Sequence, residues 1–221
     1  MTNVLLNEDI IGEVSAVFEQ LKEPVEVLFF GKKMDCEYCA DTLQLIQEVV
    51  DLSKKLSLTI VDIEEEPAVA GQYNVDKTPG LVVAGRDGEK ILDYGIRHAG
   101  IPSGHEFSTL INDIVMVSGR ESGLNQQTRE FLNGLNEPVL MQVFVTPTCP
   151  YCPRAVILAH QMALESPMVE AEMVEATEFP ELANRFNVSG VPQTTINNGA
   201  GTVVGAVPEE NMLAELMRVT G

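Results

Sequence analysis

Hydrophobic positions along the chain alternate between helical and strand-like spacing, in an order that recurs. From Glu8 to Lys22 apolar residues return every three or four positions, and the pattern stops at Pro24, which predicts an opening helix. The short apolar run from Val25 to Phe30 predicts a buried strand. A loop over 31–35 then leads into a second helical pattern, from Cys36 to about Leu56. The chain therefore begins with the order helix, strand, loop, helix.

The remaining pattern completes this unit and then repeats it. After residue 56 we expect strands over 58–63, 81–84 and 90–94, and helices over 67–73 and 104–117. In the second half we expect helices over 126–135, 149–165 and 181–186 and from residue 209, with strands over 139–145, 168–174, 194–196 and 202–205. Strands that alternate with helices in this way predict an α/β fold.

A constant offset relates the two halves. Cys36 and Cys149 lie 113 positions apart, and the same offset carries Val61 to Val174, Pro67 to Pro180, Val75 to Val188 and Pro79 to Pro192. Recurrence at a fixed offset indicates an internal duplication. We therefore predict an N-terminal domain over 1–118, a polar linker over 119–123 and a C-terminal domain over 124–221, each domain large enough to bury its own core.

Composition narrows the classes of partner. Of 221 residues, 33 are Asp or Glu and 14 are Lys or Arg, which gives a formal net charge of −19. This charge opposes binding to a phosphate backbone, so we expect no nucleic-acid partner. Because no apolar stretch approaches the roughly 18 residues that suggest a membrane span, we expect no membrane association. The first 13 residues carry three acids and lack the order of a targeting peptide, so we expect a cytoplasmic protein.

All four cysteines lie in two Cys-x-Tyr-Cys motifs, Cys36 to Cys39 and Cys149 to Cys152, each between a strand pattern and a helix pattern. With the first Cys at a helix start, the second falls one turn later on the same face, and the two sulfurs can close a small disulfide ring. The helix dipole favours the thiolate of the first Cys, which attacks a partner disulfide, and the second thiol then resolves the mixed disulfide. The spacing therefore predicts thiol–disulfide exchange.

Two other uses of four cysteines stay open at this point. Four thiolates can form a zinc ligand set, although zinc motifs bring their pairs together over roughly 15 to 20 residues and these pairs are much further apart. The second alternative is a pair of inert structural disulfides, but so short a ring constrains the unfolded chain little.

A proline follows the second cysteine of each motif by 40 positions, at Pro79 and Pro192. With these prolines, the two motifs and the duplication, the sequence resembles the thioredoxin superfamily, and more closely the glutaredoxin-like protein disulfide oxidoreductases that have two modules. The resemblance covers essentially the whole chain. It implies two tandem thioredoxin-like domains, each a central mixed β-sheet flanked by helices.

The resemblance also implies the roles of particular residues. The catalytic redox disulfides are expected within the motifs, Cys36 with Cys39 and Cys149 with Cys152. Substrate is expected to pair with the backbone of the loops that hold the two prolines, at Thr78, Pro79, Val191 and Pro192. A cis X-Pro bond, which is uncommon elsewhere, is expected in each of these loops.

The function implied by the resemblance is that of a protein thiol–disulfide oxidoreductase, which reduces, forms or exchanges protein disulfides and can include isomerase activity. The implied partners are disulfide-containing proteins, a separate thioredoxin-reductase-like flavoprotein as electron donor, and a peroxiredoxin. We expect no bound cofactor, because no G-x-G-x-x-G fingerprint follows a strand. A second interpretation is a redox shuttle to a peroxiredoxin, since alkyl hydroperoxide reductase flavoproteins have a similar double-module segment at their N-terminus.

One departure from thioredoxins affects proton transfer. Thioredoxins have a buried acid six residues before the first Cys, where this chain has Phe30 and Val143. Glu26, Asp62 and Glu175 each interrupt a strand-like run. They are therefore candidates either for proton transfer to the resolving thiol or for exposed positions at a sheet edge.

The charges near the two motifs differ. Asp35 and Glu37 flank Cys36, whereas Cys149 has Arg154 about one turn onward. Because like charge disfavours a thiolate, we predict the lower pKa for Cys149 and the more oxidising couple in the second motif. The histidines form no motif with the cysteines and are expected at surface or packing positions: His98, His105 and His160.

Overall fold

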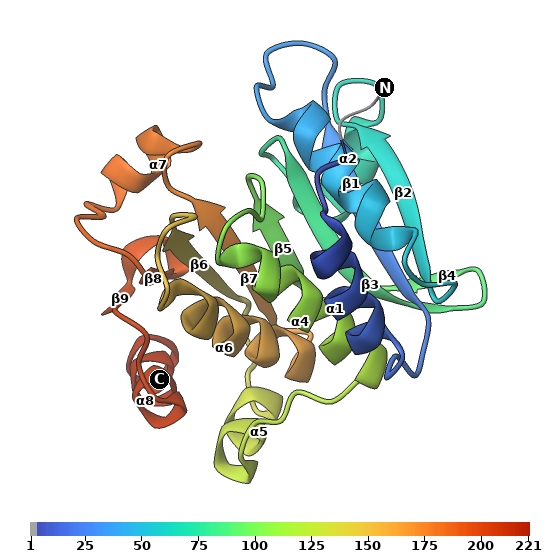
Figure 1. Ribbon diagram of the computed structural model, residues 1–221. Coiled ribbons are helices and arrows are strands. Elements are labelled where there is room, and N and C mark those ends of the chain that lie inside the picture. The colour runs from blue at the N-terminus through green and yellow to red at the C-terminus, as the bar shows by residue number, and fades with distance from the viewer. Residues whose placement is uncertain (1–3) are drawn as a thin grey trace.

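The computed structural model describes residues 4–221 and places both halves of the chain on one mixed β-sheet (Figure 1). Its strands are β1 Val25–Gly31, β2 Leu56–Asp62, β3 Gly80–Asp87, β4 Lys90–Leu92, β5 Ile96–Ala99, β6 Val139–Val145, β7 Val169–Glu175, β8 Gln193–Ile196 and β9 Gly201–Val204. They lie in the order β2-β1-β3-β5-β7-β6-β8-β9, and β4 pairs with β3 beside this path.

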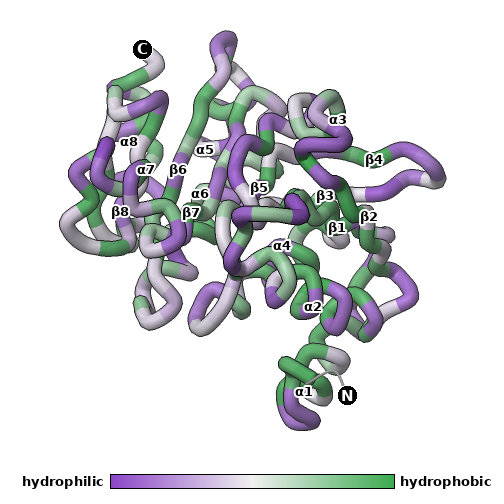
Figure 2. Tube along the Cα trace, turned by 90° about the horizontal axis from the view of Figure 1, so that it is seen from above, coloured by the Kyte–Doolittle hydropathy of each residue, from purple (hydrophilic) through white to green (hydrophobic). Residues whose placement is uncertain are grey.

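Helices cover both faces of the sheet. They are α1 Glu8–Phe18, α2 Cys39–Val50, α3 Pro67–Gln72, α4 Glu106–Gly119, α5 Gln126–Asn133, α6 Cys152–Glu165, α7 Pro180–Arg185 and α8 Glu209–Thr220, with a short 3-10 helix over Asn197–Gly199. Buried apolar residues of α1, α2, α4 and α6 form one large core with one face of the sheet, whereas smaller clusters on the other face involve α3 and α7. Figure 2 shows α3 on the opposite side of the sheet from α2 and α4.

Five strands point the same way. β1 is parallel to β2, β7 is parallel to both β5 and β6, and the antiparallel β3 between β1 and β5 gives those two strands the same direction. The carboxyl ends of β1 and β6 therefore lie at one edge of the sheet, which we call the dithiol edge because each motif follows one of these strands. All seven residues of β1 are buried, as expected for a strand covered on both faces.

Strand β5, which the hydrophobic pattern did not predict, joins the sheets of the two halves. It pairs with β3 of the first half and with β7 of the second. Its sequence includes Arg97 and His98, which are buried through polar partners and so hide the strand from a hydrophobicity criterion. Gly95 permits the approach, since it has a φ of 75° and a Cβ there would lie 2.4 Å from the carbonyl oxygen of Val169.

Several predicted boundaries were wrong. The helices that follow the motifs begin at Cys39 and Cys152, not at Cys36 and Cys149, because the first three residues of each motif form a turn; in the second motif Cys149 donates its N–H to the Thr146 carbonyl. The first of these helices ends at Val50. The opening helix ends at Phe18 instead of Lys22, and the strand predicted over 90–94 ends at Leu92.

The described part of the chain contains no helix that is both long and apolar enough to cross a bilayer. Residues 1–3, which belong to the segment from which we predicted no targeting signal, lie outside the described residues.

Candidate active site

Each motif contains one disulfide. Cys36 is bonded to Cys39 with their Cα atoms 5.4 Å apart, and Cys149 is bonded to Cys152 with a Cα separation of 5.5 Å. In both pairs the first cysteine is the more exposed: Cys36 is half-buried and Cys39 is 9% exposed, while Cys149 is 7% exposed and Cys152 is fully buried. Exposure therefore favours the first cysteine of each pair as the sulfur that meets a partner.

The first cysteine of each motif lies just before the N-terminus of a helix, in the turn that leads to α2 or α6. Unpaired backbone N–H groups and the positive end of the dipole face this turn. Although the expected helix start was three residues too early, the electrostatic consequence is the same, and the position favours the thiolate form of Cys36 and Cys149.

Both disulfides lie at the dithiol edge and on the face covered by α2, α4 and α6. Three strands, β3, β5 and β7, separate β1 from β6. At about 4.8 Å per strand, this places the ends of β1 and β6 roughly 19 Å apart. The four sulfurs therefore form two separate pairs instead of the single ligand set that a four-cysteine zinc site requires.

The two proline loops also reach the dithiol edge. The Thr78-Pro79 and Val191-Pro192 bonds are both cis, as expected. Each loop enters a strand beside its motif strand, since β3 starts opposite the end of β1, with Gly80 paired to Phe30, and β8 starts beside β6. The carbonyls of Pro79 and Pro192 accept equivalent hydrogen bonds, from the N–H of Gly100 at 2.9 Å and of Gly205 at 2.8 Å. The structure thus brings each predicted substrate loop to its own disulfide.

The sequence matches the thioredoxin domain family over residues 24–112 and 139–218, and each matched segment contains one motif and one proline loop. The chain belongs to this family. We call the two matched segments the first and the second thioredoxin module.

Solved structures with both modules are similar over the whole chain. A protein disulfide oxidoreductase from Aeropyrum pernix is 32% identical, with a TM-score of 0.89 over 100% of this chain and 95% of that one. The N-terminal NTD_N/C domain of the alkylhydroperoxide reductase AhpF from Enterococcus faecalis is 27% identical, with a TM-score of 0.85 over 98% of this chain and 100% of that one. The tandem thioredoxin fold with two Cys-x-x-Cys disulfides supports thiol–disulfide redox chemistry.

Among curated proteins, the alkyl hydroperoxide reductase protein AhpF of Staphylococcus epidermidis is 28% identical over 204 residues, which are 90% of this chain and 36% of that protein. The corresponding protein of Staphylococcus aureus is also 28% identical, over 87% of this chain and 34% of that protein. The chain thus spans about a third of the length of these curated relatives.

The three candidate acids occupy different positions in the thioredoxin modules. Glu26 lies near the start of β1, at the end remote from the dithiol edge, and on the face opposite α2. There it accepts hydrogen bonds from Ser57, Thr59 and Arg86. Its side chain is buried, so the alternative of an exposed edge position is wrong for Glu26. The structure does not bring Glu26 together with either disulfide.

Asp62 and Glu175, in contrast, lie at matched positions beside the two disulfides. Asp62 pairs in register with Gly31 at the end of β1, and Glu175 pairs with Val145 at the end of β6. In register, paired side chains share a face, which here is the face of α2 and α6. Asp62 accepts hydrogen bonds from the N–H groups of residues 64 and 65. Glu175 is 2% exposed, which rules out the edge alternative for it too, and its Oε1 is buried without a hydrogen-bond partner.

An acidic cluster that the sequence did not predict lies between the modules at the dithiol edge. Glu178 accepts a hydrogen bond of 2.7 Å from the N–H of Ile101. Burial raises the pKa of Glu178 to about 7, and the nearby Glu175 and Glu37 add to the rise. The pKa of Tyr38 is also raised, most by Glu37 and further by burial, Glu178 and Glu175. Negative charge from the second module therefore reaches the first motif.

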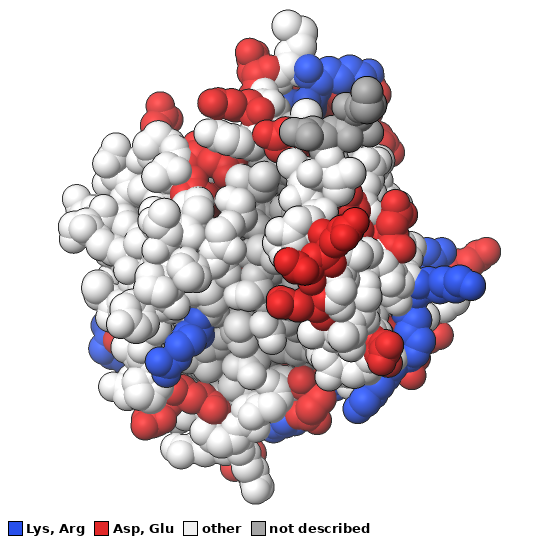
Figure 3. Space-filling model, in the orientation of Figure 1, with Lys and Arg blue, Asp and Glu red and all other residues white. Residues whose placement is uncertain are grey.

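The acids are also unevenly distributed on the surface. On the face drawn in Figure 3, Asp and Glu side chains gather over α1 and α2, whereas the surface over α4 and α6 carries few charged side chains. The first motif thus lies on the more acidic side of this face.

Two of the histidines belong to a buried network that crosses the modules. His98 Nε2 on β5 and His160 Nδ1 on α6 each lie 2.9 Å from Oδ2 of Asp113 on α4, and all three side chains are sealed from solvent. Burial lowers the pKa of His98. Burial alone would raise the pKa of Asp113, but His160 and His98 lower it overall. By residue type the three could ligate a metal. Because both facing ring nitrogens already bond the carboxylate, we assign the network to holding the modules together.

Proposed function

We propose that the chain is a protein thiol–disulfide oxidoreductase, which reduces, forms or exchanges disulfides of protein substrates through mixed disulfides at both modules. One observation carries the proposal: each module places a disulfide-bonded Cys-x-x-Cys pair, with its more exposed sulfur ahead of a helix N-terminus, beside its own cis-proline loop. A loop backbone next to a reactive sulfur is suited to hold an extended polypeptide, because main-chain groups at a strand start can pair with it.

In the reductive direction, the thiolate of Cys149 attacks one sulfur of a substrate disulfide. The substrate's other sulfur leaves as a thiolate and takes up a proton, and a Cys149 mixed disulfide forms beside Pro192. The thiolate of Cys152 then attacks the Cys149 sulfur, which releases the second substrate thiol and closes the Cys149–Cys152 disulfide. The substrate gains two electrons and two protons, and the module loses them. Cys36 and Cys39 perform the same steps beside Pro79.

Asp62 and Glu175 are the proposed acceptors for the proton of the resolving thiol. Each follows the strand next to its motif strand and lies on the face that holds Cys39 or Cys152. A carboxylate in this position can take the proton from the buried thiol as the thiolate forms, which is the task of a general base.

Regeneration of the dithiols requires an electron donor, for which we propose a separate thioredoxin-reductase-like flavoprotein. The similarity to AhpF over most of the chain supports a second candidate function, that of a redox shuttle to a peroxiredoxin. Both disulfides lie on one edge of one sheet, which suits a relay that receives electrons at one module and passes them on at the other.

The first test is the reduction of insulin disulfides by dithiothreitol, catalysed by the wild type, Cys36→Ser, Cys149→Ser and the double variant. We expect each single variant to retain the activity of the other module and the double variant to lose catalysis. If neither the wild type nor any variant accelerates the reaction, the proposal is wrong. A relay additionally predicts that both single variants fail to transfer electrons from a flavoprotein reductase to a peroxiredoxin.

A further inference from the structure

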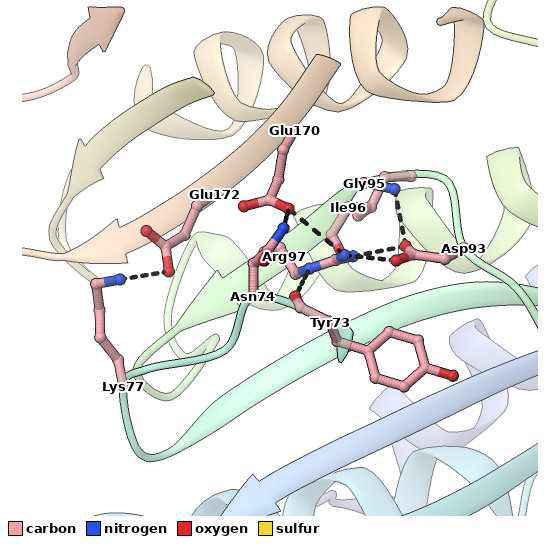
Figure 4. Close-up of polar contacts among 9 residues, drawn as sticks. All are labelled: Tyr73, Asn74, Lys77, Asp93, Gly95, Ile96, Arg97, Glu170 and Glu172. Atoms are coloured by element: carbon pink, nitrogen blue, oxygen red, sulfur yellow. Dashed lines mark hydrogen bonds and ion pairs between the residues drawn. The ribbon is translucent and has the colours of Figure 1, made fainter. Parts of the chain in front are cut away.

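The loop that brings Pro79 to the first disulfide is fastened to the second module. We call residues 73–79 the first proline loop; it links α3 to β3. Figure 4 shows two of its side chains, those of Asn74 and Lys77, directed at Glu170 and Glu172 on β7. These acids alternate along β7 and so lie on one face of the strand, the face that α2, α4 and α6 do not cover.

The ion pair between Lys77 and Glu172 is the central contact. Lys77 Nζ lies 2.9 Å from Glu172 Oε1, and the two side chains are only 16% and 11% exposed. The other carboxylate oxygen, Oε2, accepts a hydrogen bond of 2.8 Å from Gln142 Nε2 on β6. Glu172 is therefore fixed from its own module, and it can hold Lys77 in one position. Burial alone would lower the pKa of Lys77, but Glu172 and Asp76 raise it, which keeps the ammonium charged.

Further contacts fix the start of the loop. Asn74 Nδ2 donates a hydrogen bond of 2.9 Å to Glu170 Oε2. The carbonyl of Tyr73 accepts a hydrogen bond of 2.8 Å from Nε of the buried Arg97 on β5, and Asp93 holds the guanidinium of Arg97 with both oxygens (Figure 4). The loop is thus held near both ends before it turns into Pro79.

The corresponding loop of the second module, residues 186–192, has no such support. Asn187 repeats the left-handed backbone of Asn74, with φ values of 51° and 54°, but Gly190 stands where the first module has Lys77. Ser189 and Gly190 are exposed. The cause is the position in the sheet: β9, which pairs with β8, is the last strand of the sheet, whereas β5 of the first module is flanked by β7. The support is therefore one-way.

From these contacts we propose that Lys77 is a positioning residue for the first disulfide, held by Glu172 of the second module so that the first proline loop is preformed to pair with a substrate polypeptide. The inference rests on the proposed function. It assigns the second module a task besides its own chemistry, since it organises the substrate loop of its neighbour and receives no equivalent support. A preformed loop costs less conformational entropy on binding, so its loss weakens binding of a polypeptide and leaves the sulfur chemistry unchanged.

The test isolates the first disulfide with Cys149→Ser and Cys152→Ser. The pre-reduced protein is mixed with excess insulin or with a small disulfide, 5,5′-dithiobis(2-nitrobenzoate), and closure of the Cys36–Cys39 disulfide is followed in a single turnover. We expect Lys77→Met to raise the insulin concentration for half-maximal rate roughly fivefold, and to leave both the maximal rate and the rate with the small disulfide unchanged. Lys77→Arg should retain the parent behaviour.

Glu172→Gln should reproduce Lys77→Met, and the double variant should be no worse than either, because both changes remove one contact. The matched control is Glu215→Gln, which removes an ion pair with Arg218 in α8, away from either loop. Hydrogen exchange over residues 74–79 supplies a readout independent of activity, and it should become faster in Lys77→Met and in Glu172→Gln.

The proposal is overturned if the half-saturating insulin concentration is unchanged in both variants, or if insulin and the small disulfide slow equally. Should Lys77→Met fail to fold, Glu172→Gln decides by the same criteria. A parent protein that oxidises with neither disulfide would instead refute the proposed function, so the two failures are distinguishable.

Discussion

Gly31 and Asp62 face each other in register across β1 and β2, and a Cβ on Gly31 would lie 3.3 Å from the sulfur of Cys39. The carboxylate is therefore a lateral neighbour of the position that the resolving sulfur occupies. We predict that Asp62→Asn slows resolution of the Cys36 mixed disulfide by roughly tenfold or more, because the amide cannot accept the thiol proton. Rapid-mixing release of a reduced substrate from the preformed mixed disulfide measures this step.

Glu26→Gln is the matched control for this prediction, since Glu26 lies at the opposite end of β1 and on its other face. It should leave the rate of resolution unchanged, whatever it does to stability through its contacts with Arg86. Equal slowing by both substitutions would contradict a local role for Asp62.

The two motifs should differ in thiolate content. Asp35 and Glu37 flank Cys36, and the effect of Glu175 and Glu178 on Tyr38 shows that acids of the second module reach the same motif. We predict that Cys149 alkylates faster than Cys36 with iodoacetamide at pH 7, and that the Cys149–Cys152 couple is the more oxidising. Single-module variants allow each rate and each potential to be measured separately.

Removal of the acid next to Cys36 tests the cause of this difference. Glu37→Gln should raise the alkylation rate of Cys36 and narrow the gap between the modules, with no change at Cys149. Coincident or reversed rates in the two single-module variants would show that local charge does not set the order.

Much of this site could be predicted from sequence, because it depends on features that recur locally. The cysteine spacing, the apolar run of β1 and the proline that follows each motif are all visible in a few neighbouring residues. Asp62 and Glu175 were found because a carboxylate in an apolar strand pattern is conspicuous. Glu26 meets the same criterion, and only the register and direction of β1 separate it from the other two.

The contacts between modules could not be predicted from sequence. Strand β5 lacks a hydrophobic pattern because Arg97 and His98 are buried with partners from distant segments. Lys77 and Glu172 look like ordinary surface charges until the pairing of β5 with β7 brings the modules side by side. Burial that depends on long-range pairing leaves no local periodicity, so neither the acidic cluster nor the histidine network had a sequence signal.

The histidine network should be important for stability. We predict that Asp113→Ala lowers the free energy of unfolding by on the order of 3 kcal/mol, because it leaves two buried imidazole N–H groups without an acceptor and opens a cavity between α4 and α6. Urea unfolding measures the change. Asp51→Ala, at the exposed end of α2, is the control and should change stability by less than about 0.5 kcal/mol. Equal effects would contradict the assignment.

The same network should make stability depend on pH. The folded pKa of His98 is lowered below its ordinary value of 6.5 by burial, so the unfolded chain takes up a proton first as the pH falls. Stability contributed by the neutral ring is therefore present above pH 6.5 and declines as the pH falls below it. His98→Gln, whose side-chain amide can still donate to Asp113, should flatten this part of the profile. Unfolding free energies between pH 5 and 8 provide the test, and a profile unchanged by the substitution would contradict it.

Glu106 should show the opposite sign. It is 1% exposed at the start of α4, and burial raises its pKa to about 7 although Thr109 donates a hydrogen bond to it. The folded state therefore holds a proton that the unfolded chain releases, and stability falls as the pH rises from about 4.5 to 7. We predict that Glu106→Gln stabilises the protein above pH 7 by up to about 3 kcal/mol and has little effect at pH 4.5. Exposed Glu13→Gln should show no such pH dependence, and a stabilisation by Glu106→Gln that is constant from pH 4.5 to 8 would contradict a buried proton at this carboxyl.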